Sequence, residues 1–244
     1  MQPILGAAHL YQNRPRPALE ACRRAFELAR RVGSLRAELL SRDIASAVYF
    51  FMGDLVRAAD EAQQTIDLCE RLGARRFEAE AMGILGMTLF ARGERERAEA
   101  VVDQAWAVCE GVGEIYVGPW VLGAQARVTR DPAKRRDALA RAEALLAQGC
   151  VSHAYFHFYD LAIEASLDEG AWSEALRYAL ALQDYTRAEP VPWADLVVRR
   201  GRVLARHGAG EQGTAVLDEL AAVAQAAREV GYVAFATRID ALSR

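Results

Sequence analysis

The chain has 244 residues, of which 52% are hydrophobic and 26% are charged, and its formal net charge is −3. This balance argues against an intrinsically disordered chain, which combines low hydrophobicity with high net charge. The lack of a basic excess argues against nucleic acid as a partner. No signal-peptide pattern and no apolar run of about 18 residues is present. We therefore expect no membrane span and a cytoplasmic location.

The cysteines show no sign of a redox or metal site. They lie within helical patterns and form no Cys-x-x-Cys or zinc-type spacing: Cys22, Cys69, Cys109 and Cys150. We therefore expect reduced thiols and no bound metal. Lys134 is the only lysine, and the arginine-rich, alanine-rich composition is typical of a bacterial, GC-rich gene.

A stripe of small and apolar residues recurs every 40 residues from the start of the chain. Its three clearest copies are Ala18, Cys22, Phe26, Ala29 and Val32, then Ala58, Ala62, Ile66, Cys69 and Leu72, then Ala98, Val102, Trp106, Cys109 and Val112. The offsets follow one face of a helix with 3.6 residues per turn. Gly33, Gly73 and Gly113 follow the copies, and glycine suits the left-handed position that ends a helix.

Another helix is expected before each of these stripes. Its small or tight position recurs at Gly6, Ser46, Gly86, Gly123, Ile163 and Gly201. Turns between the two helices are expected near Asn13, Gly53, Gly93, Pro132, Gly170 and Gly208. No alternating pattern typical of strands is present. The sequence predicts one all-α domain over residues 1–244, a right-handed α-solenoid of about six hairpins with a period of about 40 and a capping helix over residues 232–242.

The hairpin pattern resembles the TPR repeat. Leu85-Gly86, Gly93 and Ala98 match the TPR signature, as do Leu122-Gly123 and residues 170–176. The period is longer than the TPR period of about 34 residues, as in the long-helix TPR arrays of bacterial regulators.

Residues 152–165 and 184–195 carry a narrower resemblance. They look like the C-terminal helical region of bacterial proteins that join a class III nucleotidyl cyclase domain, an ATPase domain and TPR repeats. The resemblance implies that this chain is the regulatory region of a longer signalling protein. No GxxxxGK[ST] loop and no cyclase-type aspartate pair occur in the chain itself.

Four residues at helical spacing raise the question of a metal site. His153, His157, Asp160 and Glu164 share one helix face, and two His at i and i+4 can bind one ion. The aromatic neighbours favour the alternative that this face packs between repeats. No GxSxG nucleophile motif is present. We expect no catalytic residue, no cofactor and no metal.

Arginines are concentrated near residue 200. They are Arg199, Arg200, Arg202 and Arg206. A charged outer face is the preferred interpretation of this cluster, and an anion-binding site is the alternative.

In a TPR array the first helix of each hairpin lines the concave groove, so the helix register predicts which residues point inward. The predicted groove residues are Tyr11, Phe50, Phe51, Met87, Phe90, Trp120, Arg127, Asp160, Glu164 and Arg202. One of Phe50 and Phe51 is expected in the core, while Phe90 and Trp120 are expected to anchor a bound segment.

These features favour a non-catalytic interaction or sensor module. The expected partner is a protein or peptide segment, with another domain of the parent protein as one candidate. Two alternatives stay open, namely a structural scaffold that self-associates, for example as a homodimer, and a small-ligand sensor.

Overall fold

The computed structural model describes residues 2–242, and every regular element in that range is a helix. The thirteen helices are α1 (Gln2–Tyr11), α2 (Pro15–Val32), α3 (Leu35–Met52), α4 (Leu55–Leu72), α5 (Arg75–Ala91), α6 (Arg95–Cys109), α7 (Glu114–Val128), α8 (Pro132–Ala147), α9 (Ser152–Asp168), α10 (Trp172–Tyr185), α11 (Pro192–Gly208), α12 (Thr214–Val230) and α13 (Val233–Leu242). The predicted all-α class is confirmed. None of these helices is long and apolar enough to cross a membrane.

Local sequence signals set the helix ends. The Ser34 hydroxyl accepts a hydrogen bond from the Ala37 amide at 3.4 Å and caps α3. The Asp131 carboxylate likewise accepts from the Ala133 amide at 2.8 Å, directly before Pro132 opens α8. All six expected turns lie at or next to the predicted residues, namely Asn13, Gly53, Gly93, Pro132, Gly170 and Gly208.

One glycine prediction is wrong. Gly113 is not left-handed but precedes α7 with φ −145°, and Gly111 is the left-handed residue after α6. Gly208 is the last residue of α11, and the left-handed residue of the turn that follows it is Gly210, with φ 102°. A Cβ atom on Gly208 would lie 2.6 Å from the Trp172 ring, so close packing accounts for this glycine.

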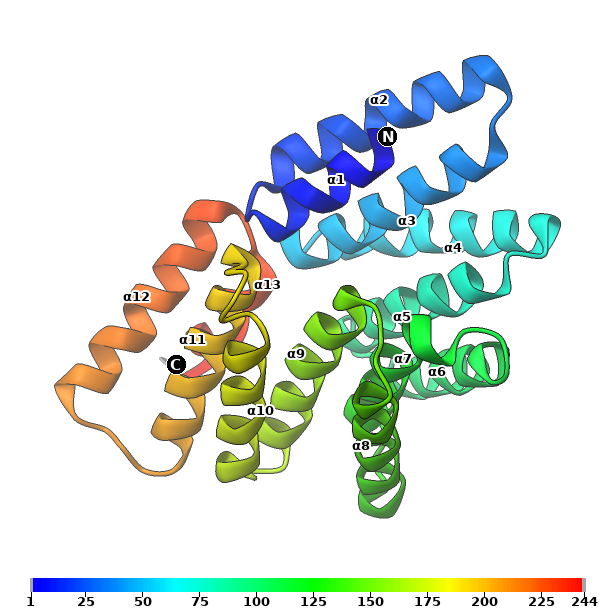
Figure 1. The fold of residues 1–244 in the computed structure, drawn as a ribbon. Helices are drawn as coiled ribbons and strands as arrows, with labels where there is room; N and C mark the ends of the chain where they lie inside the picture. The colour runs from blue at the N-terminus through cyan, green and yellow to red at the C-terminus, as the bar shows by residue number, and fades with distance from the viewer. Residues whose placement is uncertain (1, 243–244) are drawn as a thin grey trace.

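Each helix packs on the next helix in the chain, and the odd-numbered helices also pack on one another in series. The chain curls as it proceeds, so that its last helices return to its first ones (Figure 1). Helix α11 contacts α1, and α13 contacts α3. One cluster of buried apolar side chains therefore runs from Leu10 to Ile239.

The predicted tight positions are places of close helix contact. A Cβ atom would lie 2.7 Å from Cys22 Sγ at Gly6 and 2.3 Å from Val102 Cγ2 at Gly86. Both neighbours belong to the helix that follows in the chain. These glycines therefore let α1 and α5 approach their partners α2 and α6.

Gly86→Ala is expected to lower the free energy of unfolding by about 1–3 kcal/mol, because the added methyl group overpacks the contact with Val102. Urea denaturation of the purified chain measures the loss. Gly83→Ala on the same helix is the matched control, since a Cβ there meets nothing closer than Val121 at 4.0 Å. That variant should be neutral or slightly stabilised by the better helix propensity of alanine. Equal losses at the two positions would contradict the packing argument.

Candidate functional site

An aromatic cluster joins the first helices of the chain to the last ones. Phe51 of α3 lies at its centre, with ring centroids 5.5 Å from Trp193 of α11 and 5.4 Å from Phe235 of α13. The Tyr232 hydroxyl donates a hydrogen bond to the Leu10 carbonyl at 2.6 Å. The Asn13 side-chain amide donates to the Pro192 carbonyl at 2.8 Å. The space between the first and last helices is therefore bridged by the protein's own side chains, on the side where the concave groove was predicted.

A pocket of about 440 Å³ lies beside this cluster, at the C-terminal ends of α3, α5, α7 and α9. We call it the central pocket. It holds seven of the ten predicted groove residues, namely Phe50, Phe51, Met87, Phe90, Arg127, Asp160 and Glu164. Arg200 of α11 and the α13 residues Phe235 and Arg238 complete it.

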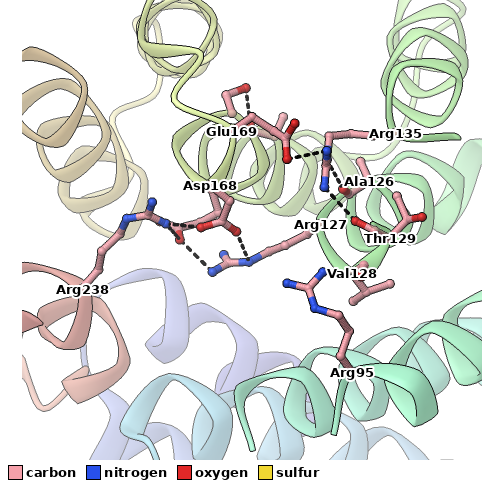
Figure 2. Close-up of polar contacts among 12 residues, drawn as sticks. Arg95, Ala126, Arg127, Val128, Thr129, Arg135, Asp168, Glu169 and Arg238 are labelled. Carbon is pink, nitrogen blue, oxygen red and sulfur yellow. Dashed lines mark hydrogen bonds and ion pairs between the residues drawn. The ribbon is translucent and has the colours of Figure 1, made fainter. Parts of the chain in front are cut away.

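One side of the central pocket is a network of arginines around a single buried carboxylate. Glu164 is 2% exposed and forms ion pairs with Arg127 at 2.8 Å, with Arg238 at 3.3 Å and with Arg200. Asp168 pairs with Arg238 at 2.5 Å and lies 3.8 Å from Arg127, as Figure 2 shows. Helices α7, α9, α11 and α13 thus meet through these charges.

The charges of this network fix the protonation of its acids. Burial raises the pKa of Glu164, but the charges of Arg127, Arg200 and Arg238 outweigh it and hold the pKa well below its usual range. Asp160 is farther from compensating charge, and burial raises its pKa to about 6. Glu164 is therefore ionised at neutral pH, while Asp160 titrates close to neutrality.

The rest of the central pocket is apolar and lies beside one charged guanidinium. Phe90 is half-buried and carries the guanidinium groups of Arg95 and Arg127 over its ring at 4.6 and 5.5 Å. Arg127 Nε is buried without a hydrogen-bond acceptor. Arg95 itself donates to the Val128 carbonyl at 2.7 Å. The Nε atom of Arg127 instead faces the Asp168 carboxylate at 3.8 Å. The site offers an aromatic surface next to a charged guanidinium, and no nucleophile–base pair lies among its lining residues.

A second buried arginine nearby has a structural role. Arg135 of α8 donates to the carbonyls of Ala126 and Thr129 at 2.9 and 2.7 Å and pairs with Glu169 of α9 at 2.6 Å (Figure 2). It ties the end of α7 to α8 and α9. These contacts hold the helix that carries Arg127 in place.

The remaining predicted groove residues lie elsewhere. Tyr11 and Trp120 line a second, smaller pocket at the N-terminal ends of the same helices. Trp120 is 6% exposed and its ring stacks on His157 with centroids 4.0 Å apart, so it is not the exposed anchor that was expected. Arg202 is exposed, contacts Gln183 and lines neither pocket. Phe51 is buried and Phe50 half-buried, as predicted for that pair.

The four-residue stripe on α9 is divided between the two pockets. His153 and His157 line the smaller pocket, while Asp160 and Glu164 line the central pocket. Within residues 2–242, no group of three His, Cys, Asp or Glu side chains is placed to hold a metal ion.

Three residues of the central pocket were not predicted from the sequence, namely Arg200, Phe235 and Arg238. Arg200 was assigned to a charged outer face, and this is wrong because its side chain is buried. A signal was present, since Trp193, Val197, Arg200 and Leu204 form one helical stripe and all are buried. The sequence of α13 carries no such signal. This helix was expected to cap the end of the array, so its residues were not placed in the groove.

Comparison with known proteins assigns the chain to no family. No protein-family model matches the chain. No curated protein matches it either.

Proposed function

We propose that this chain is a non-catalytic sensor module that binds a small amphipathic molecule in the central pocket. The observation that carries the proposal is the pocket itself. At about 440 Å³ it lies within the range of small-molecule sites, which are mostly apolar with a few charged groups. Phe50, Phe90 and Met87 supply the apolar surface, and the Arg127 guanidinium supplies a positive charge beside it. The ligand would combine an aromatic or aliphatic body with an anionic group.

The bridge between the first and last helices favours a small molecule over a long docked segment. A helix laid along the groove would have to displace α13, which is held by Phe235 in the aromatic cluster and by Arg238 in the charge network. Recognition of a short protein end in the same pocket is the second candidate. It needs the same aromatic surface and the same arginine.

We further propose the architecture and context of the module. Successive helix pairs with close glycine contacts at Gly6 and Gly86 support six TPR-like hairpins in a right-handed solenoid, with α13 as the cap. The sequence resemblance supports a role as the regulatory region of a bacterial, cytoplasmic cyclase–ATPase signalling protein. In that setting, ligand binding would be passed to the other domains through the position of α13.

The test uses anilinonaphthalenesulfonate, a fluorescent aromatic anion, as the probe. We expect saturable binding to the native chain and a loss of about 30-fold or more in affinity in Phe90→Ala, because truncating an anchor costs about 2 kcal/mol or more. Arg127→Gln should also weaken binding, since it removes the positive charge beside the Phe90 ring. Fluorescence titration at neutral pH measures both.

Arg202→Gln is the matched control for Arg127→Gln, because it removes one arginine outside both pockets. Its affinity should equal that of the unmodified chain. Circular dichroism of each variant separates lost binding from lost folding. Unchanged affinity in folded Phe90→Ala and Arg127→Gln would show that the central pocket is not the binding surface.

A further inference from the structure

The smaller pocket has a chemistry of its own. It measures about 210 Å³ and lies at the N-terminal ends of α3, α5, α7 and α9, on the other side of His157 and Trp120 from the central pocket. We call it the acidic pocket. Two carboxyl groups face it, Asp43 from α3 and Glu80 from α5. Asp43 is 5% exposed and Glu80 is 9% exposed.

Three polar atoms in the acidic pocket have no hydrogen-bond partner. They are Asp43 Oδ1, Glu80 Oε2 and His153 Nε2, and all three atoms are buried. Buried polar atoms in native proteins nearly always have a partner, so three orphans around one cavity indicate a missing partner. The two carboxyl oxygens are acceptors, and the role of the imidazole nitrogen depends on its tautomer. Nε2 of His157 is already bonded to the Tyr11 hydroxyl at 2.9 Å.

The acidic pocket also lacks a positive charge of its own. No ion pair joins Asp43 or Glu80 to another residue within 2–242. The charge of Arg76 acts on Glu80 and lowers its pKa, but Arg76 is exposed and lies over the Phe77 and Tyr116 rings at 4.8 and 4.9 Å. Burial raises the pKa of both carboxyls, and the charge of Asp43 adds to the effect on Glu80. Two neighbouring carboxyl groups that form no ion pair within the protein favour a positively charged ligand.

Aromatic rings form much of the remaining wall. Tyr116 packs edge-on against Phe77 with centroids 5.6 Å apart and against His153 at 4.7 Å. Trp120 lies next to His153 at 6.5 Å. Aromatic faces attract ammonium groups and also accommodate apolar bodies. The two histidines do not oppose this, because burial lowers the pKa of His153 to about 4 and of His157 to about 3, so both are neutral.

We propose that the acidic pocket binds a small primary amine with an apolar body. A protonated primary amine has three N–H donors and one positive charge, which matches the unpartnered oxygens of two carboxyl groups beside the unpartnered Nε2 of His153. The volume limits the ligand to a small alkyl or arylalkyl amine. This site is separate from the central pocket and does not depend on the function proposed for it.

Isothermal titration with butylamine, cyclohexylamine and phenethylamine tests the proposal, each beside the alcohol of the same shape. We expect at least one amine to bind saturably and its alcohol to bind at least about tenfold more weakly, because the alcohol lacks the charge. The quaternary analogue phenethyltrimethylammonium should also bind more weakly than phenethylamine, since it has no N–H donor. Absence of saturable binding by all three amines would overturn the proposal.

Asp43→Asn and Glu80→Gln identify the pocket. Each should weaken amine binding by about tenfold or more while keeping the shape of the side chain. Asp67→Asn and Glu70→Gln on the exposed side of α4 are the matched controls and should bind like the unmodified chain. Phe90→Ala should leave amine binding unchanged, which separates this site from the central pocket. Equal affinity in Asp43→Asn, Glu80→Gln and the unmodified chain would overturn the assignment. Asp43 and Glu80 would then be a pair of carboxyl groups that share a proton and bind no amine.

Discussion

Glu164→Gln is expected to destabilise the fold by about 3–5 kcal/mol, because it removes the carboxylate that neutralises three arginines. Arg200 is 4% exposed and would remain charged in the interior, with Asp160 as the nearest acid in the network. Removing one partner of a buried ion pair is much more costly than removing an exposed pair, since the remaining charge cannot reach water. The loss should appear as a lower urea midpoint at neutral pH.

The pH dependence of the stability difference between Glu164→Gln and the unmodified chain gives a second readout. The folded pKa of Glu164 lies below the ordinary value of 4.5, so its contribution to stability is present above that pH and is lost as the pH falls below it. The gap between Glu164→Gln and the unmodified chain should therefore narrow in acid. Glu219→Gln is the control, because Glu219 pairs with Arg206 at 2.8 Å in an exposed position and should contribute less than about 1 kcal/mol. Similar losses in both variants would contradict a special role for Glu164.

Phe51→Ala is expected to cost about 3–5 kcal/mol, because a fully packed aromatic ring is replaced by a cavity. Phe51 is 3% exposed and contacts rings from α9, α11 and α13, including Trp193 and Phe235. The cavity would form where the last helices meet the first ones. Urea denaturation measures the total loss, and hydrogen exchange should show that α13 is the helix whose amides become least protected.

Phe50→Ala is the matched control for that experiment. Phe50 is the neighbouring residue, has the same ring and lies half-buried at the rim of the central pocket. Its truncation should cost less and should leave the exchange of α13 near that of the unmodified chain. If Phe50→Ala raised the hydrogen exchange of the α13 amides as much as Phe51→Ala, the aromatic cluster would not be what holds α13 in place.

Local signals made the helices predictable from sequence. The hydrophobic stripes and the turn residues act within one hairpin, so positions such as Gly53 and Pro132 could be placed without knowing the rest of the fold. The error at Gly113 has a packing cause. Gly113 lies against Arg76, so a contact with another helix, and not turn geometry, accounts for this glycine.

The candidate site was predictable only where it follows helix register. Phe90 and Arg127 lie four residues after the tight positions Gly86 and Gly123, and Glu164 lies one residue after Ile163. Both phases were predicted to face inward, and the structure gathers the three residues in one pocket. The bridge between the first and last helices could not be read in this way. It depends on the sum of small rotations between successive helix pairs, which no single residue encodes. Arg238 and Phe235 were therefore missed, and Trp120 was expected at the surface.

The hydrogen bond between Tyr232 and Leu10 joins residues 222 positions apart. In a linear array of helices, each unit is stabilised only by its neighbours, and the ends unravel first. Here the terminal helices stabilise each other, so fraying at either end requires breaking the aromatic cluster as well. The entropy of closing so long a loop grows only with the logarithm of its length. Such distant contacts nevertheless raise the contact order, which slows folding and makes the two ends of the molecule cooperative.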